Sequence, residues 1–295
     1  MNKLHTIPPL RKWAFPFEED AYIRGVIHSN PGKPFVNFIH GNGFCGQAYW
    51  SFLKELTGDY SLLIQDCVGH GDSDEGSGFQ SWEESAGHAY EVLKNKLDKG
   101  LIKQPLIGMG HSFGGVLTIK LAAKYPDLFK ALVLLDPILM PDVFLKMKGD
   151  LDIPNPLAEK TRLRKKLWSD REEALGYFKT KSAYNTWSDC SLENFIEYAL
   201  DHQSDGGVSL KCPPEVEAAI YSSSPDGLWG DIEKLQVPTT ILYGKQSYPF
   251  IEGSCQKASE NPNINIVKEE GGHCFLLEHP KKVASITKKY LRKIV

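Results

Sequence analysis

A serine enclosed by glycines is the strongest chemical signal in the sequence. The motif GHSFG (residues 110–114) follows an apolar run at 105–110 and precedes a helical pattern at 113–125. A G-x-S-x-G pattern between a strand and a helix is typical of a sharp turn that exposes a nucleophilic serine. The helix N-terminus also favours developing negative charge. We therefore interpret Ser112 as a nucleophile, rather than as an incidental residue of a glycine-rich turn.

A serine needs a neighbouring base, because its hydroxyl is a weak nucleophile at neutral pH. Histidine titrates in the range required to take that proton and return it to a leaving group. His273 follows the apolar run at 264–269 and two glycines, which give its loop the freedom to reach over a sheet edge. We expect His273 to be the base. His111, beside the serine, is expected to be structural.

The elements that must position these residues form an alternating pattern. Short apolar runs alternate with helical patterns, which favours a parallel α/β sheet. From about 139 to 234 helical patterns dominate, and strands resume at 239. We predict a core of residues 1–138 and 235–295 and a helical cap of residues 139–234. A cap inserted there would cover the carboxyl edge of the sheet, where open α/β folds bind ligands. Strands are expected at 22–29, 35–41, 61–66, 105–110, 131–136, 239–244 and 264–269.

Four motifs occur in the order found in one known family. They are HGNGF (40–44), GHGDSD (69–74), GHSFGG (110–115) and EGGHCFLLEHP (270–280). On these motifs the chain resembles an α/β-hydrolase over nearly all of its length. The resemblance implies a mostly parallel central sheet flanked by helices, with an inserted helical cap. It also implies a serine hydrolase with a catalytic triad and a nucleophile elbow.

The resemblance also implies an oxyanion hole, made of backbone N–H groups. One donor would be the N–H of Phe113, the residue after the nucleophile. The second would come from the HGNGF loop, where Asn42 is preferred and Gly43 and Phe44 are alternatives. Such donors stabilise negative charge that develops on the substrate oxygen.

The acid of the triad is missing from the place that most of the family uses. That place, three residues after Gly244, holds Ser247. A second location known in the family is the end of the strand after the elbow helix, and here that strand ends in Asp136. We predict that Asp136 orients His273, although an aspartate that merely ends a strand would look the same. Glu252 and Glu270 stay open as alternative acids.

A dinucleotide-binding look-alike provides an alternative function. Residues 41–46 fit G-x-G-x-x-G after a strand, and Asp66 ends the next strand 20 residues later. That spacing is typical of an NAD(P)-binding oxidoreductase. The same glycines also suit an oxyanion loop, which needs close backbone approach. A non-catalytic ligand-binding or signalling protein on a hydrolase scaffold is the third possibility, because fold does not settle function.

Composition limits the classes of molecule that the protein is expected to bind. The chain has 295 residues and a net charge of −3, which gives no reason to expect nucleic acid or an acidic membrane surface. No apolar run approaches a membrane span, and the N-terminus lacks a secretory apolar region. Six scattered cysteines show no ligand spacing, so we expect no metal and a cytoplasmic, reduced protein. The basic run KTRLRKK (160–166) is interpreted as a solvated helix face.

These observations together predict a serine hydrolase that cleaves carboxylic esters of short to medium acyl chains through an acyl-enzyme intermediate. Its partner would be a small-molecule ester with an apolar acyl or aromatic part, because the predicted cap is rich in aromatic residues. No cofactor and no stable membrane association are expected. A thioesterase, a C–C hydrolase or a lyase could use the same triad. The sequence gives no indication of the oligomeric state.

Overall fold

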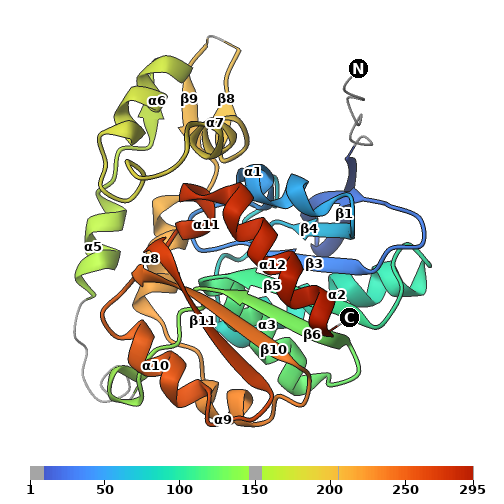
Figure 1. The fold of residues 1–295 in the computed structure, drawn as a ribbon. Coiled ribbons are helices and arrows are strands. Elements are labelled where there is room, and N and C mark those ends of the chain that lie inside the picture. The colour runs from blue at the N-terminus through green and yellow to red at the C-terminus, as the bar shows by residue number, and fades with distance from the viewer. Residues whose placement is uncertain (1–9, 146–154, 205, 295) are drawn as a thin grey trace, which may run out of the picture.

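A mixed, mostly parallel sheet is the centre of the molecule (Figure 1). The computed structural model describes residues 10–145, 155–204 and 206–294. The expectation that the N-terminus lacks a secretory apolar region concerns residues that lie largely outside this description. The order is β1-β2-β4-β3-β5-β6-β10-β11, in which β2 is antiparallel to both of its neighbours. The predicted fold class is confirmed. The strands are β1 (Arg11–Glu18), β2 (Ala21–His28), β3 (Phe35–Ile39), β4 (Ser61–Gln65), β5 (Leu106–His111), β6 (Phe129–Leu135), β10 (Thr239–Gln246) and β11 (Ile264–Gly272).

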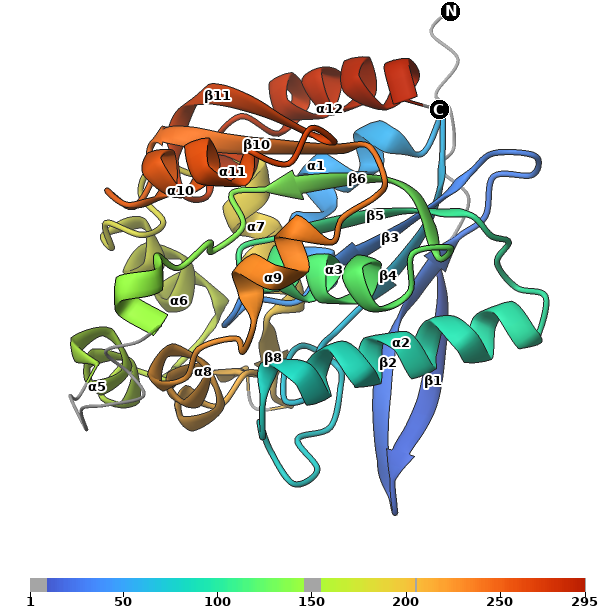
Figure 2. The same ribbon diagram turned by 90° about the horizontal axis from the view of Figure 1, so that it is seen from below.

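Helices cover both faces of the sheet (Figure 2). One face carries α2 (Trp82–Asp98), α3 (Phe113–Lys124), α9 (Leu228–Glu233) and α10 (Ile251–Ala258). The other carries η1 (Gly46–Tyr49), α1 (Trp50–Leu53), η2 (Lys54–Leu56), α11 (Phe275–Glu278) and α12 (Pro280–Ile294). The helix α3 is buried almost all round because it lies between the sheet and two helices, α2 and α9. An apolar helix such as this is stable only when it is enclosed.

The edge strand β1 was not predicted from the sequence. It contains Pro16 and charged residues at both ends, which weaken the strand pattern. Proline is tolerated at a sheet edge, because an edge strand leaves backbone N–H groups without a ladder partner. The strand pairs with β2 through an antiparallel hairpin, and an irregularity in register falls next to Pro16.

The segment between β6 and β10 is mostly helical but also carries a small sheet. Its helices are α5 (Pro156–Arg162), α6 (Arg171–Lys179), α7 (Asp189–Tyr198) and α8 (Pro214–Ser222). The sheet has the order β7-β9-β8, from β7 (Leu167–Trp168), β8 (Leu200–His202) and β9 (Val208–Leu210). These strands were not predicted, because two or three residues are too few to show alternation. We call residues 139–234 the insert; α9, near its end, packs against α3 rather than above the sheet.

One helix start in the insert differs from the sequence-based expectation. The sequence suggests a capping box at Ser169 and Glu172, but α6 begins one residue later. Asp170 is its N-cap, and the Asp170 carboxylate accepts a hydrogen bond from the Glu173 N–H at 2.8 Å. Ser169 instead donates its N–H and its hydroxyl to the Glu173 carboxylate. Aspartate and serine are both good N-caps, so composition could not choose between them.

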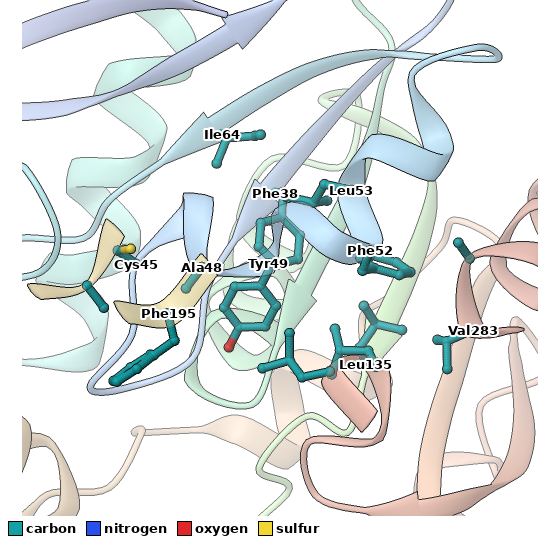
Figure 3. Packing of buried hydrophobic residues seen from close by; sticks show 14 of the residues in the cluster. Phe38, Cys45, Ala48, Tyr49, Phe52, Leu53, Ile64, Leu135, Phe195 and Val283 are labelled. Atoms are coloured by element: carbon teal, nitrogen blue, oxygen red, sulfur yellow. The ribbon is translucent and has the colours of Figure 1, made fainter. Parts of the chain in front are cut away.

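The insert shares a hydrophobic cluster with the core. Phe195 of α7 lies beside Ala48 and Cys45 (Figure 3). The centre of the Phe44 ring, in the loop after β3, lies 5.5 Å from the ring centre of Trp187 and 5.9 Å from that of Phe195. Because aromatic rings at these separations pack with direct contact, the insert is held on the sheet by apolar burial.

Acidification should destabilise the fold. Burial lowers the pKa of His40 to about 3 and of His70 to about 4, so both stay neutral when folded. Unfolding at pH 5 would protonate them, whereas Asp66, whose pKa burial raises to about 6, opposes the trend. The three groups should together lower the free energy of unfolding by roughly 2 kcal/mol between pH 7 and pH 5. Urea titration at the two pH values measures this difference, and equal midpoints would contradict it.

Candidate active site

The turn at Ser112 is a strained elbow between β5 and α3. Ser112 has φ 53° and ψ −116°, a backbone conformation that residues other than glycine seldom adopt. A Cβ atom at Gly114 would lie 2.2 Å from the carbonyl oxygen of Ile39, and one at Gly110 would lie 2.3 Å from that of Gly114. The flanking glycines are therefore required sterically, and the tight turn presents the Ser112 side chain at the cavity described below.

Asp136 and His273 meet at the carboxyl edge of the sheet. Asp136 follows β6, is fully buried and has φ 45°. Its Oδ1 lies 2.9 Å from His273 Nδ1, and its Oδ2 accepts the Gly244 N–H at 2.8 Å. A carboxylate accepts, so Nδ1 carries the proton and Nε2 of the neutral ring is left as a base. The structure thus brings together the pair that the sequence suggested.

Ser247 adds a second bond to the same carboxylate oxygen. Its hydroxyl donates to Asp136 Oδ1 at 2.6 Å, so this oxygen accepts from both Ser247 and His273. The hydroxyl therefore occupies the loop position where relatives are expected to place their acid, and it contacts the carboxylate of Asp136. The sequence shows that position 247 holds a serine where most of the family has an acid, but it does not predict this contact.

The two alternative acids lie elsewhere. Glu252 accepts from the hydroxyl of Tyr243 at 3.2 Å and from Lys268 Nζ at 2.6 Å. Glu270 forms an ion pair with Lys245. In the described part of the chain neither carboxylate contacts an imidazole. Both are engaged with surface lysines, which leaves Asp136 as the acid beside His273.

A buried hydrogen-bonded chain connects three loops of the site. The Gly41 N–H donates to the Tyr49 hydroxyl at 3.1 Å, and that hydroxyl lies 2.8 Å from His111 Nδ1. His111 Nε2 lies 3.0 Å from the backbone carbonyl of His273. Because a carbonyl accepts, Nε2 carries the proton and Nδ1 accepts from Tyr49. Burial lowers the pKa of His111 well below its usual range, so the ring stays neutral.

The loop after β3 is held by side-chain contacts from Asn42. Asn42 Nδ2 donates to the backbone carbonyl of Glu217 at 2.9 Å, and Asn42 Oδ1 lies 3.3 Å from His70 Nε2. The backbone N–H groups of Asn42 and Phe113 have no acceptor within the described part of the chain. Both residues line the same cavity as Ser112. Two such donors beside a nucleophile can bind an oxyanion.

The acidic residue of the dinucleotide look-alike is used within the fold. Asp66 Oδ1 accepts the Gly46 N–H at 2.7 Å, and Oδ2 accepts the Asp72 N–H at 2.9 Å. Asp66 is 7% exposed, and burial raises its pKa to about 6. Its carboxylate therefore fixes the loops after β3 and β4 to each other. This gives the 20-residue spacing a structural explanation that needs no nucleotide.

One large cavity contains these groups. Its volume is about 1390 Å³, which exceeds the usual range of roughly 300–1,000 Å³ for ligand pockets. Asn42, Ser112, Phe113 and His273 all line it. The other walls come from the insert and from the loop after β10. The site can therefore combine a serine, a base with a buried acid, and unpaired N–H donors around one cavity.

A polar network on the insert side of the cavity was not predicted from the sequence. Arg164 forms an ion pair with Glu217 and donates to the Tyr184 hydroxyl at 3.3 Å. All three side chains line the cavity. A Cβ atom at Gly43 would lie 2.7 Å from the Glu217 carboxylate, so the network touches the loop after β3. In the sequence these three residues share only their position in the insert, and this alone could have pointed to them.

The described residues contain no candidate metal centre and no candidate membrane-spanning helix. No group of three or more His, Cys, Asp or Glu residues among them is arranged to hold a metal ion. Likewise, none of the helices in residues 10–145, 155–204 and 206–294 combines the length and apolarity that a membrane crossing requires.

Known proteins share both the sequence and the fold. The model of the alpha/beta hydrolase family matches residues 38–286. The chain is 34% identical over 236 residues to the abhydrolase domain-containing protein AKT2 of Alternaria alternata, covering 65% of this chain and 85% of that protein. It is 25% identical over 260 residues to a putative 2-succinyl-6-hydroxy-2,4-cyclohexadiene-1-carboxylate synthase of Bacillus subtilis, with coverage of 86% and 89%. The peroxisomal alpha-beta-hydrolase Lpx1 of Saccharomyces cerevisiae superposes with a TM-score of 0.78 at 18% identity, covering 97% of this chain and 88% of that chain. The chain therefore belongs to the α/β-hydrolase family.

Proposed function

We propose that the protein is a serine hydrolase that cleaves carboxylic esters of short to medium acyl chains. The observation that carries the proposal is the 2.9 Å contact between Asp136 Oδ1 and His273 Nδ1, because His273 lines the cavity that also contains the elbow serine. A buried acid, an imidazole and a half-buried serine hydroxyl that lines the cavity are the three parts of an acyl-transfer site.

In the proposed mechanism, Ser112 Oγ attacks the acyl carbonyl while His273 Nε2 takes its proton. Asp136 stabilises the resulting imidazolium, and the N–H groups of Phe113 and Asn42 bind the oxyanion. The imidazolium returns the proton to the leaving alcohol as the ester bond breaks. Water then attacks the acyl-enzyme with His273 as base, which releases the acid and restores the serine.

The proposed partner is a small molecule with an apolar acyl or aromatic part, and neither nucleic acid nor a stably bound membrane. Ile138, Met140 and Phe178 are among the apolar residues that line the cavity. Burial of such surface favours an acyl chain over a fully charged substrate. We also propose a cytoplasmic location, which the six free cysteines support, because disulfides are rare where thiols are kept reduced.

Labelling with a fluorophosphonate probe tests the proposal directly. The purified protein is treated with the probe, and the modified peptide is mapped by mass spectrometry beside the Ser112→Ala variant. We expect label on Ser112 and none on the variant, because the probe reacts with serines activated by a base. A folded protein without label would overturn the proposal and favour the non-catalytic ligand-binding function.

A second candidate is a non-hydrolytic reaction, such as a lyase reaction, on the same residues. It is favoured by the relative of Bacillus subtilis that is named a putative synthase and is matched over most of both chains. Turnover in water enriched in oxygen-18 separates the candidates. A hydrolase, whether it acts on an ester, a thioester or a C–C bond, incorporates the isotope into the released acid, whereas an elimination does not.

Removal of the Tyr49 hydroxyl should lower kcat about tenfold, the usual loss for one misaligned hydrogen bond. In Tyr49→Phe, His111 Nδ1 and the Gly41 N–H lose their shared partner, so the loops of His273 and Asn42 lose their link. KM should change little, because Tyr49 is buried outside the substrate cavity.

Steady-state kinetics on one ester, with separate kcat and KM, provide the measurement. The matched control is Tyr60→Phe, a buried tyrosine of the same hydrophobic cluster. Equal losses of kcat in both variants would mean that the effect is general destabilisation and not positioning.

A further inference from the structure

The basic run at residues 160–166 forms part of the cavity wall. The sequence alone suggests a solvated helix face, and Lys160 is indeed exposed. However, Lys160, Arg164 and Lys165 also line the cavity that contains Ser112. Lys181, from the loop after α6, lines it as well. The insert therefore supplies four cationic side chains to a cavity in a protein whose net charge is −3.

Carboxylates neutralise two of these four cations. Arg164 pairs with Glu217, which also lines the cavity, and Lys165 pairs with Glu173. The Arg164 pair is largely buried, with side chains that are 17% and 9% exposed. These two positive charges are therefore already matched within the insert, and they hold its elements together.

Lys160 and Lys181 are the two cations of the cavity that no carboxylate of the described residues pairs. Within the described part of the chain, no carboxylate lies within ion-pair distance of either ammonium group. The Nζ of Lys181 lies 4.2 Å from the centre of the Tyr177 ring, a contact that orients the charge without cancelling it. The cavity therefore has a wall with unneutralised positive charge.

The same cavity has an apolar wall. Ile138, Met140, Phe144 and Phe250 line it, and the rings of Phe144 and Phe250 lie 5.7 Å apart, edge to face. A ligand that matches both walls carries an apolar chain and an acidic group. The volume of about 1390 Å³ leaves room for such a molecule in addition to the reacting carbonyl.

We propose that the cavity binds an amphiphilic acyl substrate whose acidic group, a carboxylate or a phosphate, lies at Lys160 and Lys181. This proposal rests on the proposed hydrolase function and specifies its substrate class. The acidic group has two possible sources. It can be the far end of the acyl chain, as in a monoester of a dicarboxylic acid, or the phosphates of a leaving group such as coenzyme A in an acyl thioester.

Kinetics with three probes test the proposal. They are the p-nitrophenyl ester of octanoic acid, the p-nitrophenyl monoester of suberic acid and octanoyl-coenzyme A. In Lys160→Gln/Lys181→Gln, we expect kcat/KM for an acidic probe to fall about tenfold relative to the neutral ester, the loss expected for two exposed ion pairs. Lys166→Gln is the matched control, because Lys166 belongs to the same basic run and does not line the cavity.

The two acidic probes separate the two sources. A loss confined to the suberate monoester places the acidic group on the acyl chain, and a loss confined to octanoyl-coenzyme A places it on the leaving group. High salt should reduce the preference for the acidic probe in the unsubstituted protein, because screening shortens the reach of exposed charges. An unchanged ratio for both probes would overturn the proposal.

A binding experiment keeps this proposal separate from the proposed function. In Ser112→Ala, calorimetry compares octanoate with octanol, which share a chain but differ in charge. We expect octanoate to bind about tenfold more tightly, and Lys160→Gln/Lys181→Gln in the same background to remove the difference. If the unsubstituted protein turns over no ester but Ser112→Ala shows this preference, the proposed hydrolase function is wrong and the proposed anion site stands. Equal binding of the two ligands would refute the site.

Discussion

Replacing Asp136 by asparagine should lower kcat by about 10⁴-fold, while the fold persists. Asp136 is fully buried, and its Oδ1 contacts His273 Nδ1 at 2.9 Å. Asparagine has nearly the same shape but carries no charge, so it cannot stabilise the imidazolium that forms during attack. Its amide can also donate to Nδ1, which would place the imidazole proton on the wrong nitrogen. Steady-state kinetics on one ester substrate provide the measurement.

The control for this prediction is Glu252→Gln. Glu252 contacts Tyr243 and Lys268 and lies away from the imidazole, so kcat should be nearly unchanged. Circular dichroism and urea titration of both variants show whether loss of activity reflects unfolding. If Glu252→Gln is the damaging change and Asp136→Asn is not, the acid has been assigned to the wrong residue.

Moving the acid to position 247 should restore part of the lost activity. Ser247 Oγ lies 2.6 Å from the carboxylate oxygen that contacts His273, so a carboxylate on residue 247 can reach the same nitrogen. In Asp136→Asn/Ser247→Asp we expect about a hundredfold recovery of kcat over Asp136→Asn, because charge compensation returns with imperfect geometry. The measurement is kcat of the single and double variants on one substrate.

The single variant Ser247→Asp is the informative companion. It places two carboxylates side by side in a buried site, and like charges at that distance cannot both ionise easily. One proton would then be shared, so the activity of this variant should be lower at neutral pH and should rise as the pH increases. A double variant no more active than Asp136→Asn would show that position 247 cannot present an acid to His273 in this loop.

The pairing of Asp136 with His273 could be predicted because it depends on topology. In a parallel sheet the residues after each strand gather at one edge, whatever the distance between them in sequence. Asp136 follows β6 and His273 follows β11, and β10 lies between these two strands. The sequence could locate the ends of the strands, and this was enough to bring the two residues together. The hydrogen bond from Ser247 to Asp136 depends on the conformation of one loop, and the sequence pattern does not predict that conformation.

The polar contacts of the insert could not be predicted for a related reason. Arg164 and Glu217 are 53 residues apart and come from irregular backbone and from α8. Neither lies in a motif, and hydrophobic periodicity reports which face of a helix is buried, not which partner it meets. The basic run was interpreted as a solvated surface because the sequence shows charge but not the cavity beneath it. The three short strands gave too little pattern to distinguish them from loop.

The contact between Asn42 and Glu217 has a consequence for how chain length affects the reaction. One proposed oxyanion donor lies on a residue whose side chain is tied to α8, and Glu217 is in turn paired with Arg164, which also lines the cavity. A substrate long enough to press on Arg164 would act on the geometry around the reacting carbonyl without touching it. Binding energy from the remote end of an acyl chain should therefore appear as faster turnover as well as tighter binding. Truncated esters would then understate what the enzyme can do.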